Sequence, residues 1–111
     1  MQSAATDTAE NRIFVALADP SRRAIFESLT RGEAAVKELT SRFDISQPAV
    51  SQHLAALKDA GLVAGRREGR NVYYRVEPTG LQPLIDWIAH YRAFWTEHLD
   101  RLEQLLEKMD E

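Results

Sequence analysis

Hydrophobic residues recur every three or four positions over most of the chain, which is the spacing of an amphipathic α-helix. We expect a first helix over residues 11–18 and a second over residues 20–30. Aspartate is a good helix N-cap and proline fits the first helical position, so Asp19 and Pro20 predict where the second helix begins. The chain is thus expected to open on two consecutive helices.

Two further helical patterns follow, joined by a short turn. Residues 34–43 favour a helix of about two turns, and residues 47–60 favour a longer one that Ser46 caps and Gly61 ends. Their apolar stripes are Val36, Leu39 and Phe43 in the first helix and Val50, Leu54 and Leu57 in the second. Two short helices joined in this way predict a helix-turn-helix.

After Gly61 the hydrophobic period changes to two, which is the period of a β-strand. Residues 62–67 and 71–76 are expected to form two strands, with Gly69 in the tight hairpin turn between them. Apolar residues then return at near-heptad intervals over residues 81–109, which predicts one long helix of up to about 45 Å. A single small domain cannot cover so long an apolar stripe.

The expected fold is mainly α with a small β-hairpin, and 111 residues are enough for one domain. We expect a flexible N-terminus over residues 1–10 and a single domain over residues 11–111, whose last helix spans about residues 80–109. No apolar run approaches the ~18 residues of a membrane span and the start does not look like a signal peptide, so a cytoplasmic protein without membrane contact is expected.

Charge is distributed unevenly along the chain, whose formal net charge is −3. Residues 42–75 contain six basic and three acidic side chains, a local charge of +3, whereas residues 77–111 contain three basic and eight acidic ones, a local charge of −5. The basic segment attracts a polyanion and the acidic one is repelled by it. The helix-turn-helix and hairpin are therefore expected to face nucleic acid.

The second helix of the helix-turn-helix presents small polar residues outward, as a helix in the DNA major groove must. Opposite its buried stripe lie Pro48, Gln52 and Ala55. Gln52 is the expected base reader, because its amide can form a bidentate pair with adenine. The predicted DNA contacts of this helix are Ser46, Gln47, Pro48, Ala49, Ser51, Gln52 and His53.

Some of these residues have structural alternatives. Ser46 and Gln47 would cap the helix, which is compatible with a phosphate contact because a helix N-terminus attracts anions. For His53 the favoured interpretation is a partly buried imidazole bonded to a neighbouring backbone group, and a DNA contact is the other.

The hairpin turn carries Arg66, Arg67, Arg70 and Asn71. A cationic loop can follow a phosphate backbone or enter the minor groove, so these four residues are predicted DNA contacts. The alternative is a solvated hairpin whose arginines keep an edge strand soluble. Beside a helix-turn-helix, the hairpin is expected to be a wing.

Several sequence blocks coincide with these predicted elements. They are DPSRR (residues 19–23), SQPAVSQHLAAL (46–57), AGLV (60–63) and RREGR (66–70), followed by Tyr73 and Tyr74. Together they resemble the ArsR family over about residues 13–106. The resemblance implies a winged helix-turn-helix that forms a homodimer through its N- and C-terminal helices. It further implies a repressor of transcription that binds an inverted repeat in double-stranded DNA. Repression of its own gene is one alternative for what it regulates. The implied dimer contacts are Ile13, Phe14, Leu17, Leu84, Ile88, Tyr91, Trp95, Leu99 and Leu102.

The chain departs from the metal-sensing members of that family. It has no cysteine, which excludes arsenic, lead or cadmium sensing by thiolates and also any disulfide. A zinc-responsive repressor is an alternative, with Asp86, His90 and His98 as candidate ligands on the last helix. The family's Asp-x-His pair is incomplete because position 88 is Ile88, so neither a metal nor a cofactor is expected.

Two other classes of function are weighed against DNA binding. An enzyme is not expected, because Ser51 and His53 point in different directions on one helix. A winged helix used for protein–protein contact is the stronger alternative, yet the small polar outward face lacks the large anchors of such interfaces. The aromatic residues of the last helix favour a dimer core over a pocket for an unknown small-molecule effector, and whether any effector exists stays open. These aromatic residues are Trp87, Tyr91, Phe94 and Trp95.

Overall fold

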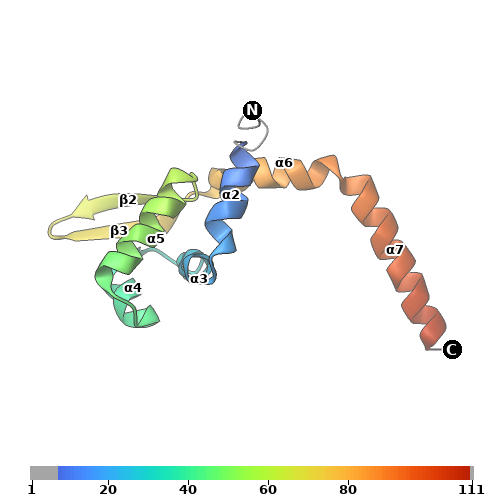
Figure 1. The fold of residues 1–111 in the computed structure, drawn as a ribbon, viewed down its shortest axis with the longest axis horizontal. Helices are drawn as coiled ribbons and strands as arrows, with labels where there is room; N and C mark the ends of the chain where they lie inside the picture. Colours follow the sequence, from blue (N-terminus) through green and yellow to red (C-terminus); the bar gives the residue numbers. More distant parts are fainter. Residues whose placement is uncertain (1–7, 111) are drawn as a thin grey trace.

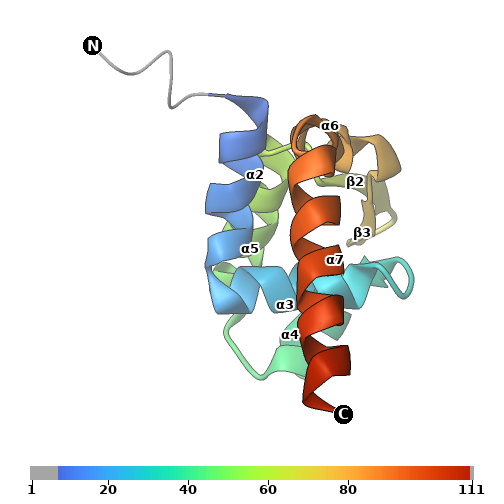
Figure 2. The same cartoon turned by 90° about the vertical axis from the view of Figure 1, so that its right-hand side faces the viewer.

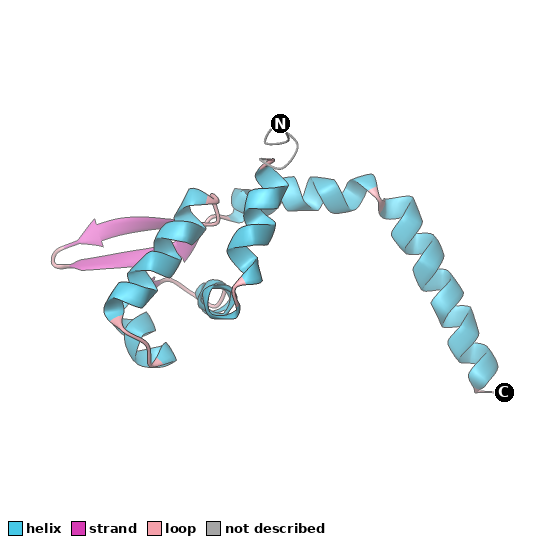
Figure 3. Cartoon of the chain, in the orientation of Figure 1, coloured by secondary structure: helices cyan, strands magenta, loops and turns pink. Residues whose placement is uncertain are grey.

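The computed structural model describes residues 8–110 and consists of helices with one small antiparallel sheet (Figures 1 and 3). The first half contains α2 (Ala9–Ala18), α3 (Pro20–Leu29), β1 (Ala34–Ala35), α4 (Val36–Phe43) and α5 (Gln47–Asp59). The second half contains β2 (Val63–Glu68), β3 (Asn71–Val76), the 3₁₀-helix η1 (Pro78–Leu81), α6 (Gln82–His90) and α7 (Arg92–Met109). Over the described residues this is the expected mainly helical fold with a β-hairpin.

The first two helices begin at side-chain caps. The Asp19 carboxylate accepts a hydrogen bond of 3.0 Å from the backbone N–H of Arg22, as predicted, and this bond lowers the pKa of Asp19. The Thr8 hydroxyl caps α2 by accepting from the N–H of Asn11 at 3.1 Å, so that helix begins at Ala9. The boundary therefore precedes the expected residue 11, and residues 1–7 of the segment expected to be flexible lie outside the described chain.

The predicted helix-turn-helix is formed by α4 and α5, but its first two residues are not helical. Ala34 and Ala35 instead form β1, which pairs with Tyr74 and Tyr73 of β3 and makes a sheet of order β1-β3-β2. Sequence periodicity predicts a helix from residue 34. That prediction is wrong for residues 34 and 35, because periodicity is a local pattern and contains no information on the backbone hydrogen bonds that the edge of β3 offers. The strand ends where the Ala35 N–H donates to the Glu38 carboxylate at 2.9 Å.

One apolar core lies between α2, α3, α4, α5 and the base of the sheet. It contains Ile13, Ala16, Ile25, Phe26, Leu29, Ala34, Leu39, Val50, Leu54, Leu57, Leu62 and Val63. The predicted stripe of α5 is fully buried in it, and burial of each such aliphatic side chain contributes about 1.5–3 kcal/mol. The core therefore fixes which face of α5 points outward.

The C-terminal segment is not the single helix that the heptad pattern predicts. A 3₁₀-helix precedes α6, and at Tyr91 the backbone (φ −107°, ψ 19°) leaves the helical conformation before α7 begins. The break lies among aromatic residues. The centre of the Tyr91 ring is 5.3 Å from that of Trp87 and 4.9 Å from that of His90, on which it packs edge-on. Figure 1 shows α7 displaced from the body, and Figure 2 shows it in the foreground. Within residues 8–110, no helix is both long and apolar enough to cross a membrane.

Candidate nucleic-acid interface

The outward face of α5 is exposed and small, as the helical spacing predicts. Gln47, Pro48, Ser51, Gln52 and Ala55 are exposed, and Ala49 is half-buried. The opposite stripe is held in the core, so the helix cannot rotate without exposing it. This arrangement leaves a polar helix surface of the width that a DNA major groove accepts.

The structural roles predicted for Ser46 and His53 have different outcomes. The Ser46 hydroxyl accepts from the N–H of Ala49 at 3.2 Å, so the expected cap is present. His53 is half-buried, but its Nδ1 is buried with no hydrogen-bond partner among the described residues, so the expected backbone bond is not found there.

A groove of about 210 Å³ lies between α5 and the wing, and α4 also lines it. It is lined by Val36, Lys37, Gln47, Ser51, Arg70, Asn71, Val72 and Tyr74. Residues from both predicted contact sets therefore belong to one continuous surface. Lys37 in the first turn of α4 joins this surface, although the sequence interpretation did not include it. A basic residue at the start of the first helix of a helix-turn-helix was the available indication.

The wing arginines are not equivalent. Arg66 is engaged within the protein: it bonds the Glu33 carboxylate at 2.6 and 3.1 Å and the Glu68 carboxylate at 3.0 Å. The bonds from Arg66 lower the pKa of Glu33 and, in return, the pKa of Arg66 is raised. By contrast, Arg67 and Arg70 are exposed and form no ion pair within residues 8–110. Of the three, these two are available to an external anion.

The expected dimer residues divide into two groups. Ile13 is 1% exposed in the core of the single chain, which leaves it little surface for a partner, and helical spacing alone does not say which stripe faces inward. Leu17 and Leu84 are half-buried against the same core. The other expected dimer residues are exposed: Phe14, Ile88, Tyr91, Trp95, Leu99 and Leu102.

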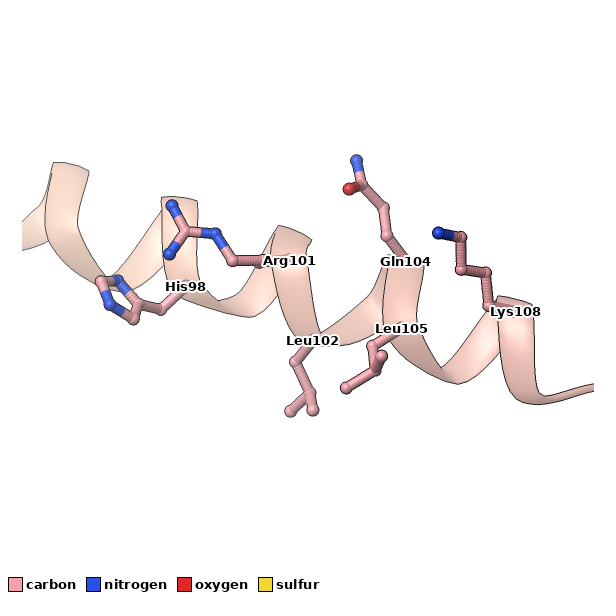
Figure 4. A pocket seen from close by; sticks show the side chains of 6 residues that line it. All are labelled: His98, Arg101, Leu102, Gln104, Leu105 and Lys108. Carbon is pink, nitrogen blue, oxygen red and sulfur yellow. The ribbon is translucent and has the colours of Figure 1, made fainter.

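These exposed residues lie on α2, α6 and α7 and, in the case of Tyr91, at the junction between α6 and α7. Phe14 packs edge-on to Trp87 at 5.4 Å and so connects α2 with α6. An apolar depression of about 610 Å³ between α6 and α7 is lined by Ile88, Trp95 and Leu99, among others. Figure 4 shows that the rest of α7 is also amphipathic, with Leu102 and Leu105 on one side and Gln104 and Lys108 on the other.

The candidate zinc ligands do not come together within one chain. Asp86 accepts from the Gln82 amide at 2.9 Å, and Nδ1 of His98 lies 2.9 Å from the carbonyl oxygen of Phe94. No group of three or more histidine, aspartate or glutamate side chains in residues 8–110 is arranged to hold a metal ion. The zinc-responsive alternative therefore finds no complete ligand set in the described part of one subunit.

Comparison with known proteins agrees with this architecture. Residues 19–64 match the model of the bacterial regulatory protein, arsR family. The chain is 44% identical to the HTH-type transcriptional regulator Rv2034 of Mycobacterium tuberculosis, covering 87% of this chain and 88% of that protein. It is 36% identical to the transcriptional repressor SdpR of Bacillus subtilis, covering 73% and 90% of the two.

A solved structure of similar sequence has the same fold. The homodimeric winged helix-turn-helix DNA-binding domain of a possible ArsR-family regulator from Mycobacterium bovis matches with a TM-score of 0.62 and 32% identity over 90% of both chains. Both curated relatives above are named as transcriptional regulators, not as enzymes. The chain is a winged helix-turn-helix protein that belongs to the arsR family of bacterial regulatory proteins.

Proposed function

We propose that this protein is a sequence-specific repressor that binds double-stranded DNA as a homodimer. Its main support is the surface shared by α5 and the wing, where exposed Gln47 and Ser51 lie beside Arg70, which forms no ion pair within residues 8–110. In this assignment α5 enters the major groove and the wing follows the adjacent phosphates. Lys37 adds a positive charge at the start of α4, where a phosphate would also meet the helix N-terminus.

The homodimer is supported by the exposed apolar face of α6 and α7, which the single chain leaves uncovered. The Mycobacterium bovis relative is named as homodimeric. A two-fold dimer presents two α5 helices to an inverted repeat, with half-sites about 10 base pairs apart or a multiple of that. Repression of the protein's own gene is one form that this activity would take.

Substitution of Gln52 by alanine is expected to reduce sequence discrimination by about 1–3 kcal/mol, because the bidentate amide contact to a base is lost. The preferred duplex is first selected from random DNA. Affinities of both proteins are then measured on that duplex and on random DNA, with Gln104→Ala as a matched control that removes the same amide from α7, away from the interface. An equal loss on both DNAs would reject Gln52 as a base reader.

Substitution of Arg70 by alanine is expected to weaken binding to every sequence alike and to lower the slope of log affinity against log salt by about one. The reason is that an unpaired wing arginine neutralises one phosphate. Titrations at several salt concentrations measure the slope, with Lys108→Ala on α7 as a control that removes the same charge away from the interface. An unchanged slope would exclude a phosphate contact by Arg70.

A further inference from the structure

Arg66 and Glu33 form the best-defined side-chain contact of the wing. The guanidinium donates from Nε to one carboxylate oxygen at 3.1 Å and from a terminal nitrogen to the other at 2.6 Å. Such two-pronged pairs fix the relative orientation of both groups as well as attracting them. Arg66 also lies over the Tyr73 ring, with its central carbon 4.9 Å from the ring centre. Four constraints, counting the bond to Glu68, therefore hold one exposed side chain.

The pair joins two parts of the fold that are far apart in sequence. Arg66 lies in β2, on the outer edge of the sheet, whereas Glu33 immediately precedes β1 on the opposite edge. Because β1 is only two residues long and leads directly into α4, Glu33 marks the entrance to the helix-turn-helix. The Arg66 side chain thus reaches across β3, and the pair links the wing to the segment that positions α4 and α5.

Backbone pairing with β1 restrains the wing only as far as Tyr73 of β3. Figure 1 shows the hairpin of β2 and β3 projecting beyond the helices, and residues 65–70 at its outer end are exposed. The base of the sheet is packed against the core through Val63 of β2, Ala34 of β1 and the partly buried Tyr74 and Val76 of β3. Beyond Arg66 and Tyr73, where the pairing with β1 ends, the hairpin is a two-stranded ribbon, which is only marginally stable by itself. A cross-sheet ion pair limits its motion.

We propose that Glu33 is a positioning residue for DNA binding: its carboxylate holds Arg66 and thereby sets the angle of the wing relative to α4 and α5. The proposal rests on the proposed function, and it assigns Arg66 to wing orientation instead of the phosphate contact that its charge alone suggested. Arg67 and Arg70 then make the contacts, from a wing that is already correctly placed. A preordered wing loses less conformational freedom on binding.

Removal of the Glu33 charge has two effects on DNA affinity, and they have opposite signs. A carboxylate near the interface repels phosphate, so simple electrostatics requires that its neutralisation tightens DNA binding. Loss of the link to Arg66 instead weakens binding. The direction of the change decides between the two.

The test compares Glu33→Gln with Glu68→Gln in the full chain on random-sequence duplex DNA. Both substitutions remove one negative charge, but Glu68 lies on the same strand as Arg66, so Glu68→Gln leaves the link between strand edges intact. We expect Glu33→Gln to bind about fivefold more weakly with an unchanged salt slope, and Glu68→Gln to bind at least as tightly as the unmodified chain. Arg66→Lys, which keeps the charge but not the two-pronged geometry, should resemble Glu33→Gln.

Amide hydrogen exchange without DNA provides a second measurement. Exchange in residues 64–75 should be faster in Glu33→Gln than in Glu68→Gln, since only the former releases the hairpin. Tighter or unchanged DNA binding by Glu33→Gln would overturn the proposal, as would full affinity in Arg66→Lys. Failure of the unmodified chain to bind any DNA would instead reject the proposed function, while the exchange rates would still report whether the pair restrains the wing.

Discussion

Replacement of Ile88 and Leu99 together by glutamate is expected to convert the protein to a monomer and to weaken binding to its preferred duplex by about a hundredfold or more. These side chains are 48% and 63% exposed in the single chain, and both line the apolar depression between α6 and α7. A carboxylate buried there without a partner costs several kcal/mol. Once the dimer separates, the two half-sites are bound independently, and a gain of about 10²–10⁴ from joint binding is lost.

Sedimentation at micromolar concentration measures the oligomeric state, and a DNA titration measures the affinity. The matched control is Gln104→Glu, which adds a carboxylate on the side of α7 that faces away from Leu102 and Leu105 (Figure 4). Circular dichroism should show that both variants keep their helices, because neither Ile88 nor Leu99 belongs to the core. A double variant that remains dimeric would place the interface elsewhere.

Replacement of Gly80 by alanine is expected to destabilise the fold by about 3 kcal/mol, the upper end of the cost of overpacking. A Cβ atom at this position would lie 2.0 Å from the carbonyl oxygen of Gly61 and 2.9 Å from its carbonyl carbon. Both contacts are to backbone that cannot rotate away. The residues that precede η1 and β2 are also joined there, by the bond from the Glu77 N–H to the Leu62 carbonyl at 2.9 Å.

Urea unfolding of the two proteins at one concentration measures this loss. Thr79→Ala is the matched control, since Thr79 is exposed in the same 3₁₀-helix and its substitution should change stability by less than about 0.5 kcal/mol. A similarly small change for Gly80→Ala would mean that η1 does not pack directly on the end of α5.

The elements with local determinants could be predicted from the sequence. Asp19 caps α3 and Ser46 caps α5, because a cap depends on side chains within three residues of the backbone groups that it satisfies. Gly61 and Gly69 have φ of 80° and 65°, the left-handed conformation that a helix end and a tight hairpin require. The outward face of α5 followed from its buried stripe in the same way.

The sequence predicts which residues of α5 and the wing form the candidate site, but not how the contacts of the three wing arginines differ. Arg66, Arg67 and Arg70 are equal in sequence, and only the position of Glu33 on the opposite edge of the sheet separates the first from the other two. Lys37 joined the groove only when α4 was placed against β3. Pairings between residues so far apart in the chain leave no periodic pattern to read.

The helix-turn-helix, the hairpin and the apolar C-terminal stripe can be predicted from the sequence, because hydrophobic period, caps and turn residues act over one or two turns of chain. By contrast, the strand at residues 34 and 35, the place of Ile13 in the core and the break of the last helix at Tyr91 are seen only in the folded chain. The same holds for the position of Gly80 against the Gly61 backbone. Each of these outcomes depends on which surface packs against which, and that is settled by contacts between segments distant in sequence.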